Sequence, residues 1–103
     1  MIRHCVMLQL PERYDRSELT SVMNGLAMVA ERLEGCSGFV AGENRDYEAK
    51  SPEYPCGFTI DFDNATALSG YAKDPEHRAL GQRLVTLCEG AERITVFDIV
   101  RRD

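Results

Sequence analysis

Apolar and polar residues alternate along the first segment of the chain, residues 2–10. A period of two is that of a β-strand, because successive side chains point to opposite faces. Val6 and Leu8 therefore share one face, and His4 lies on the same face. Pro11 ends the segment, since proline has no N–H to donate to a neighbouring strand. We predict a first strand over residues 2–10.

The next segment changes to the period of an amphipathic helix. From Leu19 to Leu33, apolar residues recur at every third or fourth position, which gives one apolar stripe along a helix. Asp15, followed three positions later by Glu18, is typical of a helix start. Gly35 is expected to close the helix in a left-handed conformation. The segment predicts a long helix packed on a sheet.

Two more strands are predicted in the middle of the chain. The first runs from Phe39 to Asn44, and the second follows a polar loop with two prolines over residues 45–55. In the second strand, apolar residues alternate with polar ones from Cys56 to Phe62. This pattern is typical of a half-buried strand, so we expect its apolar side chains to face the helices.

A short helix capped by Asn64 leads into a break in the helical pattern. Asp74 can accept hydrogen bonds from the free N–H groups of a new helix, and Pro75 suits its first turn. One helix therefore ends near Tyr71 and another begins at Pro75. This break allows the Tyr71 phenol and the His77 imidazole, six residues apart, to lean toward one point.

A final strand over residues 93–100 completes the order β-α-β-β-α-α-β. Two β-α-β halves of this kind form a ferredoxin-like α+β sandwich, with a four-stranded antiparallel sheet covered by helices on one face. The 103 residues suffice for a single domain, 1–103. The other face would expose apolar side chains, so we expect a symmetric homodimer through that face, with a barrel-like core. Those side chains are Cys5, Met7, Phe97 and Ile99.

Composition and charge narrow the range of partners. The formal net charge of −5 disfavours nucleic acid and anionic membranes as partners. Both glycine-rich nucleotide-binding patterns are absent from the sequence, so no nucleotide cofactor is expected. No apolar run reaches the length of a membrane span, and no export segment is recognised at the N-terminus, so we expect a cytoplasmic protein.

The potential metal ligands are few and widely spaced. The four cysteines lie far apart, without a C-x-x-C pair, and His4 and His77 are the two histidines. This spacing does not fit a zinc site, so we expect neither a metal nor a cofactor.

Three short motifs, in order along nearly the whole chain, resemble the stress-responsive A/B barrel (Dabb) family. They are the opening Ile-Arg-His-Cys-Val-Met-Leu, the segment from Tyr71 to His77 with its Asp-Pro-Glu-His, and the closing Val-Phe-Asp-Ile at residues 96–99. The resemblance implies a dimeric α+β barrel built of ferredoxin-like halves.

The resemblance extends to a plant cyclase of this family that closes a linear polyketide thioester by an aldol reaction. It implies that Tyr71 and His77 match the catalytic pair of that enzyme and that His4 matches a first-strand histidine. A further histidine of that enzyme is Cys56 here, and a pocket tyrosine is Leu26. Because of these two differences, the resemblance does not carry over the substrate.

The residue types also suggest the chemistry. Aldol closure requires removal of a C–H proton beside a carbonyl, which an imidazole can accept near neutral pH, while a phenol O–H can stabilise the oxyanion. We therefore hypothesise His77 as the base and Tyr71 as the oxyanion donor. Ligand-binding candidates between sheet and helices are His4, Met23, Leu26, Cys56, Phe58, Leu80, Val96 and Arg83, the last facing an acidic or thioester-carbonyl group.

The same residues have structural interpretations. His77 can bond the backbone at a helix start, Tyr71 can be a core aromatic, and a structural role is favoured for His4. A nucleophilic role for Cys56 is disfavoured, because no base is placed beside it. The protonation state of His77 stays open, since the helix dipole and Asp74 act in opposite directions.

Two hypotheses for the function therefore remain. One is a cofactor-free lyase or cyclase acting on an apolar, aromatic or polyketide-like small molecule. The other is a non-catalytic, stress-related dimer that binds a ligand.

Overall fold

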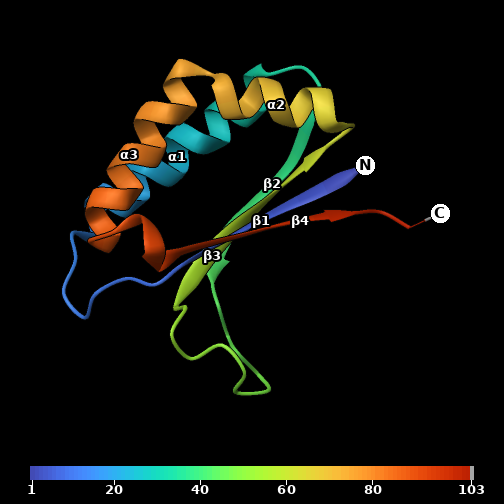
Figure 1. Ribbon diagram of the computed structural model, residues 1–103. Coiled ribbons are helices and arrows are strands. Elements are labelled where there is room, and N and C mark those ends of the chain that lie inside the picture. Colours follow the sequence, from blue (N-terminus) through green and yellow to red (C-terminus); the bar gives the residue numbers. More distant parts are fainter. Residues whose placement is uncertain (103) are drawn as a thin grey trace.

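The elements follow the predicted order in the computed structural model, which describes residues 1–102 (Figure 1). They are β1 (Ile2–Leu8), α1 (Arg16–Arg32), β2 (Cys36–Glu43), β3 (Cys56–Phe62), α2 (Ala65–Lys73), α3 (Pro75–Cys88), a 3₁₀ turn η1 (Ala91–Arg93) and β4 (Ile94–Val100).

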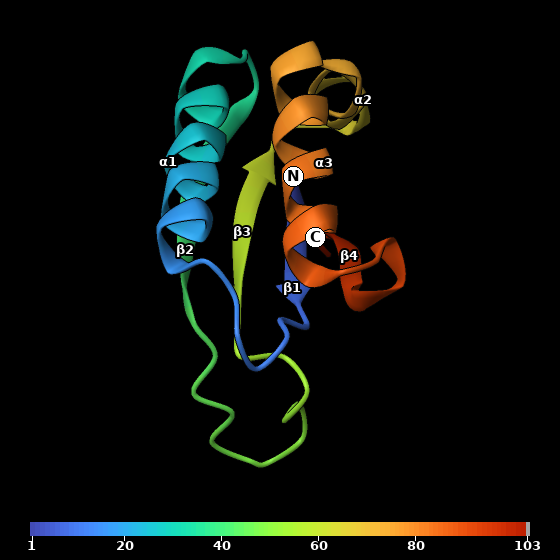
Figure 2. The same cartoon turned by 90° about the vertical axis from the view of Figure 1, so that its left-hand side faces the viewer.

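The four strands form one antiparallel sheet in the order β2-β3-β1-β4. All three α-helices lie on the same side of this sheet (Figure 1). The view in Figure 2 shows α1 and α3 side by side, and the loop between β2 and β3 extends beyond the end of the sheet. The predicted ferredoxin-like α+β fold is confirmed.

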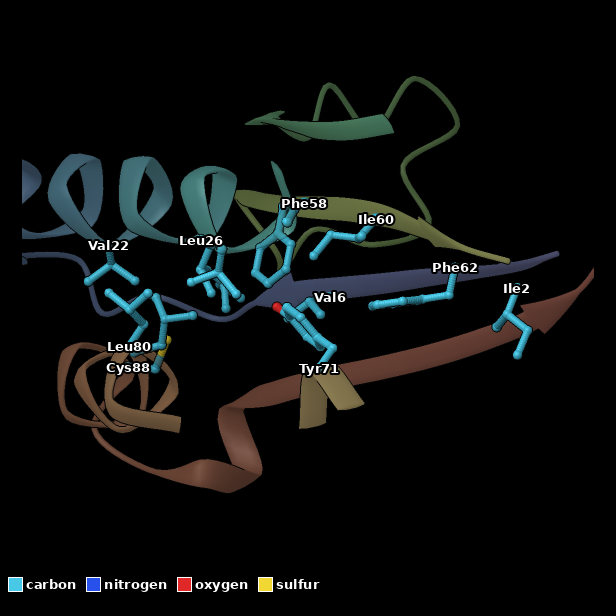
Figure 3. Close-up of a cluster of buried hydrophobic side chains, with 14 residues drawn as sticks. Ile2, Val6, Val22, Leu26, Phe58, Ile60, Phe62, Tyr71, Leu80 and Cys88 are labelled. Carbon is cyan, nitrogen blue, oxygen red and sulfur yellow. The ribbon is translucent and has the colours of Figure 1, made fainter. Parts of the chain in front are cut away.

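The core lies between the helices and the sheet (Figure 3). Leu8, Ile60 and Phe62 from the sheet and Val22 and Val29 from α1 are completely buried. These residues occupy the positions that strand and helix periodicity assign to one face. The apolar pattern of the sequence therefore correctly predicted which side of the sheet the helices cover.

The ends of α1 differ in part from the prediction. Asp15 caps the helix start as expected, accepting backbone N–H bonds. The Glu18 side chain does not reach back to complete a capping box, because it pairs with Arg83. The helix ends at Arg32, so the expected cap at Gly35 is wrong; Gly35 has φ 81° in the turn that follows.

A close approach between α1 and α3 explains Gly25 in the middle of α1. A Cβ at this position would lie 2.8 Å from Cδ2 of Leu80. Glycine therefore lets the Leu80 side chain pack directly on the α1 backbone, and this contact offsets the low helix propensity of glycine.

Two further boundaries differ by a few residues. β2 begins at Cys36, ahead of the predicted start at Phe39, and its pairing with β3 shifts register between Ser37 and Val40. β1 ends at Leu8, two residues before the predicted end at Leu10.

The side of the sheet away from the helices carries exposed apolar residues. We call this side the open face, and it is formed by Cys5, Met7, Val40, Phe97 and Ile99. The exposed fraction is 55% for Phe97 and 60% for Ile99. The register places Phe97 opposite Cys5 in the neighbouring strand, so these apolar side chains lie together.

Candidate functional site

The joint between α2 and α3 is built around Asp74. Its backbone N–H donates to the Tyr71 carbonyl at the end of α2, with an N···O distance of 3.2 Å. Its side chain accepts a 3.0 Å hydrogen bond from the backbone N–H of His77, in the first turn of α3. Asp74 thus ends one helix and begins the next, as the sequence predicted.

The joint brings the Tyr71 and His77 side chains into contact. Their ring centroids lie 3.9 Å apart, with an angle of 34° between the rings. His4 of β1 approaches Tyr71 edge-on, with a centroid distance of 5.8 Å. Phe62 completes the group, 5.1 Å from Tyr71. Side chains from β1, α2 and α3 therefore form one cluster, which we call the Tyr–His cluster: His4, Tyr71 and His77.

Two polar atoms of this cluster are buried and have no hydrogen-bond partner within residues 1–102. They are the Tyr71 hydroxyl oxygen and Nδ1 of His77. Tyr71 is only 1% exposed, and in Figure 3 its hydroxyl points into the core rather than to solvent. A buried polar group without a partner lowers the stability of the fold by on the order of 1–3 kcal/mol. A hydrogen-bonding ligand at these two atoms would remove this cost.

Burial shifts both side chains toward their neutral forms. The pKa of Tyr71 is raised above its ordinary value, chiefly by desolvation and further by Cys36 and Asp74. The pKa of His77 is lowered by desolvation and then by His4, while Asp74 and nearby backbone carbonyls oppose this shift. At neutral pH the pair therefore combines a phenol that can donate a proton with an imidazole that can accept one.

His4 is fixed by an acidic residue that the sequence-based candidates did not include. Its Nδ1 lies 2.6 Å from Oδ1 of Asp98, across the β1–β4 pairing. The His4 side chain is 12% exposed and that of Asp98 41%. The signal was present in the sequence, because Asp98 is an acidic residue in the otherwise apolar segment from Val96 to Val100.

Comparison of the chain with known protein families identifies the family to which it belongs. The model of the stress responsive A/B barrel domain (Dabb) matches residues 2–101. The chain belongs to the Dabb family. The predicted resemblance is therefore confirmed.

Solved structures agree with this assignment. A dimeric ferredoxin-like protein of unknown function from Jannaschia sp. CCS1 is 37% identical, with a TM-score of 0.92, and 97% of this chain and 98% of that chain are covered. A Dabb family protein from Mesorhizobium loti is 21% identical, with a TM-score of 0.75 and coverages of 99% and 97%.

More distant similarity reaches an enzyme. Hydroxynitrile lyase from Passiflora edulis is 10% identical, with a TM-score of 0.81 and coverages of 99% and 94%. At this identity the likeness concerns the fold alone. No functionally curated protein matches the chain significantly.

Among the ligand-binding candidates of this Dabb chain, Leu26, Phe58 and Leu80 lie in the core. They are 1%, 5% and 7% exposed. All three are therefore core residues, and Leu80 packs on Gly25 of α1; contact of these residues with a ligand stays a prediction.

Met23 and Cys56 belong to a different part of the molecule. Both line a cleft of about 760 Å³ between the start of α1 and the β2–β3 end of the sheet, with Tyr14 and Arg16 at the same cleft. Burial raises the pKa of the Cys56 thiol, which disfavours a nucleophilic thiolate. A second cleft, of about 560 Å³, reaches Tyr71 from α2.

Arg83 is engaged by α1, and Val96 lies on an edge strand of the sheet. Arg83 donates to both carboxylate oxygens of Glu18 in a groove between α1 and α3. Val96 lies on the helix-facing side of β4, opposite Val6, but it is 47% exposed because β4 is the edge strand.

Neither a metal cluster nor a membrane span was found in residues 1–102. No group of three or more His, Cys, Asp or Glu side chains in this range is arranged to hold a metal ion. No α-helix in the same range combines the length and apolar character needed to cross a bilayer.

Proposed function

We propose that this Dabb protein binds a small, largely apolar carbonyl compound at the Tyr–His cluster and transfers a proton on it. The observation that carries the proposal is the pair of buried, unpartnered polar atoms, Tyr71 Oη and His77 Nδ1. A ligand with an oxygen and an acidic C–H would supply what both atoms lack. The buried Leu26, Phe58 and Leu80 favour an apolar, aromatic or polyketide-like body for this ligand.

The proposed step balances without a cofactor. A neutral His77 nitrogen takes the proton from the carbon beside a carbonyl, and the electron pair moves onto the carbonyl oxygen. The Tyr71 hydroxyl donates a hydrogen bond to this enolate oxygen. The enolate carbon then attacks a second carbonyl of the same molecule, and the imidazolium returns its proton to the new alkoxide. This describes a cyclase, and the reverse bond cleavage describes a lyase.

One property of the site and one comparison support this class of reaction. The lowered pKa of His77 suits a base that must be neutral before it reacts. In addition, the same fold occurs in a hydroxynitrile lyase, although this argument is an analogy at the level of the fold. His4, held by Asp98, is proposed to face the ligand and to keep the Tyr71 ring in place.

The test is α-proton exchange in D₂O, followed by proton NMR with a panel of methyl ketones and β-keto thioesters as probes. We expect the protein to accelerate exchange on at least one probe by more than about tenfold, within the usual range for a positioned base. Tyr71→Phe and His77→Gln should each remove this acceleration. Tyr47→Phe is the matched control, since Tyr47 is 93% exposed in a loop. Exchange unaffected by Tyr71→Phe would contradict the proposal.

A second candidate is a non-catalytic, stress-related ligand-binding dimer. The observation that favours it is the tight packing of Tyr71, together with the fact that His77 lines neither of the two clefts described above. Under this alternative, the probes bind and protect the protein against thermal unfolding, but their α-protons exchange no faster than in buffer.

We also propose that the chain is a homodimer joined through the open face. The exposed Phe97 and Ile99 support this arrangement, since monomeric proteins rarely leave such apolar patches uncovered. The 37% identical relative from Jannaschia sp. is a dimer, and so is the ferredoxin-like protein from Thermobifida fusca. The four cysteines are unpaired, which agrees with our placement of this dimer in the reducing cytoplasm.

A further inference from the structure

Two arginine–carboxylate pairs connect α1 with α3 and with the joint between α2 and α3. Arg83 of α3 binds Glu18 near the start of α1, with a shortest N···O distance of 2.7 Å. Arg32, the last residue of α1, donates to both carboxylate oxygens of Asp74, at 3.1 and 3.0 Å. The pairs resemble each other in chemistry, but only the second lies at the joint that carries Tyr71 and His77.

Arg32 contacts Asp74, the residue that links the backbones of Tyr71 and His77. Asp74 is bonded to the Tyr71 carbonyl through its N–H and to the His77 N–H through its carboxylate. It is 8% exposed, so its charge is poorly solvated. Within residues 1–102, Arg32 is the one cation paired with the Asp74 carboxylate. This pair links the helix joint to the end of α1.

We propose that Arg32 is a positioning residue for His77: it holds Asp74 in place at the helix joint and offsets the carboxylate charge beside the imidazole. Its importance for catalysis rests on the proposed function. The arrangement itself is a property of the protein without a ligand.

The charges around His77 give the proposal a direction. Asp74 favours the protonated ring, whereas His4 from β1 and burial favour the neutral ring. Tyr71 adds no charge at physiological pH, which lies well below its ordinary pKa, and burial raises that pKa further. Glu76, next to His77, shares the Arg32 guanidinium at 3.2 Å. A paired carboxylate exerts a weaker field than a bare one, so Arg32 helps to keep His77 neutral and able to accept a proton.

The test is an NMR titration of the His77 ring in the ligand-free protein, with His77→Gln identifying the resonance. In Arg32→Gln, the uncompensated Asp74 should raise the pKa of His77. In Asp74→Asn, the cap is kept, since Asn is also a good N-cap, but the negative charge is lost, so the pKa should fall. Arg32→Lys should lie between wild type and Arg32→Gln, because it keeps the charge but loses the planar guanidinium geometry.

Glu18→Gln is the matched control, because it breaks the other arginine pair between the same helices. It should leave the titration of His77 unchanged. Opposite shifts in Arg32→Gln and Asp74→Asn, both larger than in the control, support the proposal. A general loosening of the joint would hydrate the ring in both variants and raise the pKa in both, and this result, or no shift beyond the control, overturns it.

The titration also separates this inference from the proposed function. It needs no substrate, so a negative result leaves the proton-exchange experiment unaffected. If exchange catalysis is present, its lower pH limit in Arg32→Gln should move upward together with the pKa of His77.

Discussion

Two phenylalanines in the two strands that flank β1 have opposite environments. Phe62 of β3 points toward the helices and is completely buried, whereas Phe97 of β4 lies on the open face and is 55% exposed. Each lies next to an aspartate, Asp61 or Asp98, in a strand of seven residues. The difference arises because the helices of one chain cover one face of the sheet, and only another molecule can cover the other.

The two faces also differ in what they leave unsatisfied. The covered face buries two polar atoms without partners, on Tyr71 and His77. On the open face, Arg3 and Asp61 form an ion pair with two hydrogen bonds, and apolar side chains are left exposed instead. The covered face therefore lacks polar partners, on which the proposed ligand site rests, while the open face lacks apolar cover, on which the proposed dimer rests.

The largest expected effect is on the covered face. Phe62→Ala should lower the free energy of unfolding by about 3–5 kcal/mol, because it removes buried apolar surface and leaves a cavity. Chemical denaturation followed by circular dichroism measures this change. Tyr47→Ala, which shortens a 93% exposed aromatic side chain, should change the free energy of unfolding by less than about 0.5 kcal/mol. Equal effects of the two substitutions would mean that the covered face is not the core.

An intermediate effect is expected on the open face, and it should concern association. Phe97→Asp should weaken the proposed dimer at least about a hundredfold, or about 2.8 kcal/mol, because a symmetric interface receives the buried charge twice. Analytical ultracentrifugation measures the dissociation constant, and circular dichroism checks that the monomer stays folded. Tyr47→Asp is the control for the added charge. A Phe97→Asp protein that remains fully dimeric would place the interface elsewhere.

The smallest expected effect is on the pH dependence of stability, which should differ between the two faces. Because the pKa of His77 is lowered in the folded protein, the unfolded chain binds the proton first, and stability should fall as the pH drops below about 6.5. One such group contributes at most about 1.4 kcal/mol per pH unit. Thermal melts of wild type and His77→Gln between pH 7.5 and 5.5 should show a shallower loss in the variant.

The open face should respond in a different pH range. The pKa of Asp61 is lowered by its hydrogen bonds from Arg3, so its stabilising contribution is present above the ordinary aspartate range and is lost as the pH falls through about 4 and below. Arg3→Gln should therefore leave the melts between pH 7.5 and 5.5 parallel to wild type. A changed slope in that variant would show that the two faces do not titrate independently.

Much of the candidate site could be predicted from local pattern. Asp74 and Pro75 have side-chain chemistry that ends one helix and starts another, so the contact between Tyr71 and His77 followed from neighbouring residues. The partners of this joint could not be predicted in the same way. Arg32 and Asp98 are far from it in sequence, and their periodicity does not identify which carboxylate or imidazole they meet.

Other candidates were separated by the fold. Met23 and Cys56 were grouped with the Tyr–His cluster but line the cleft at the other end of the sheet, and Arg83 is engaged by Glu18. Helix periodicity predicts which face of α1 a residue occupies. It does not predict how far that residue lies from the Tyr–His cluster, because this distance depends on the packing of α1 against α3, which includes the contact between Gly25 and Leu80.

The sequence by itself determined the elements, the face that each strand turns to the helices, and the joint at Asp74, because these depend on the period of the side chains and on residues within one or two turns. The tertiary structure alone decided that Arg32 braces the joint, that Asp98 holds His4, and that two polar atoms are left buried without partners. Those contacts depend on the summed packing of distant elements, and no short stretch of the chain contains that information.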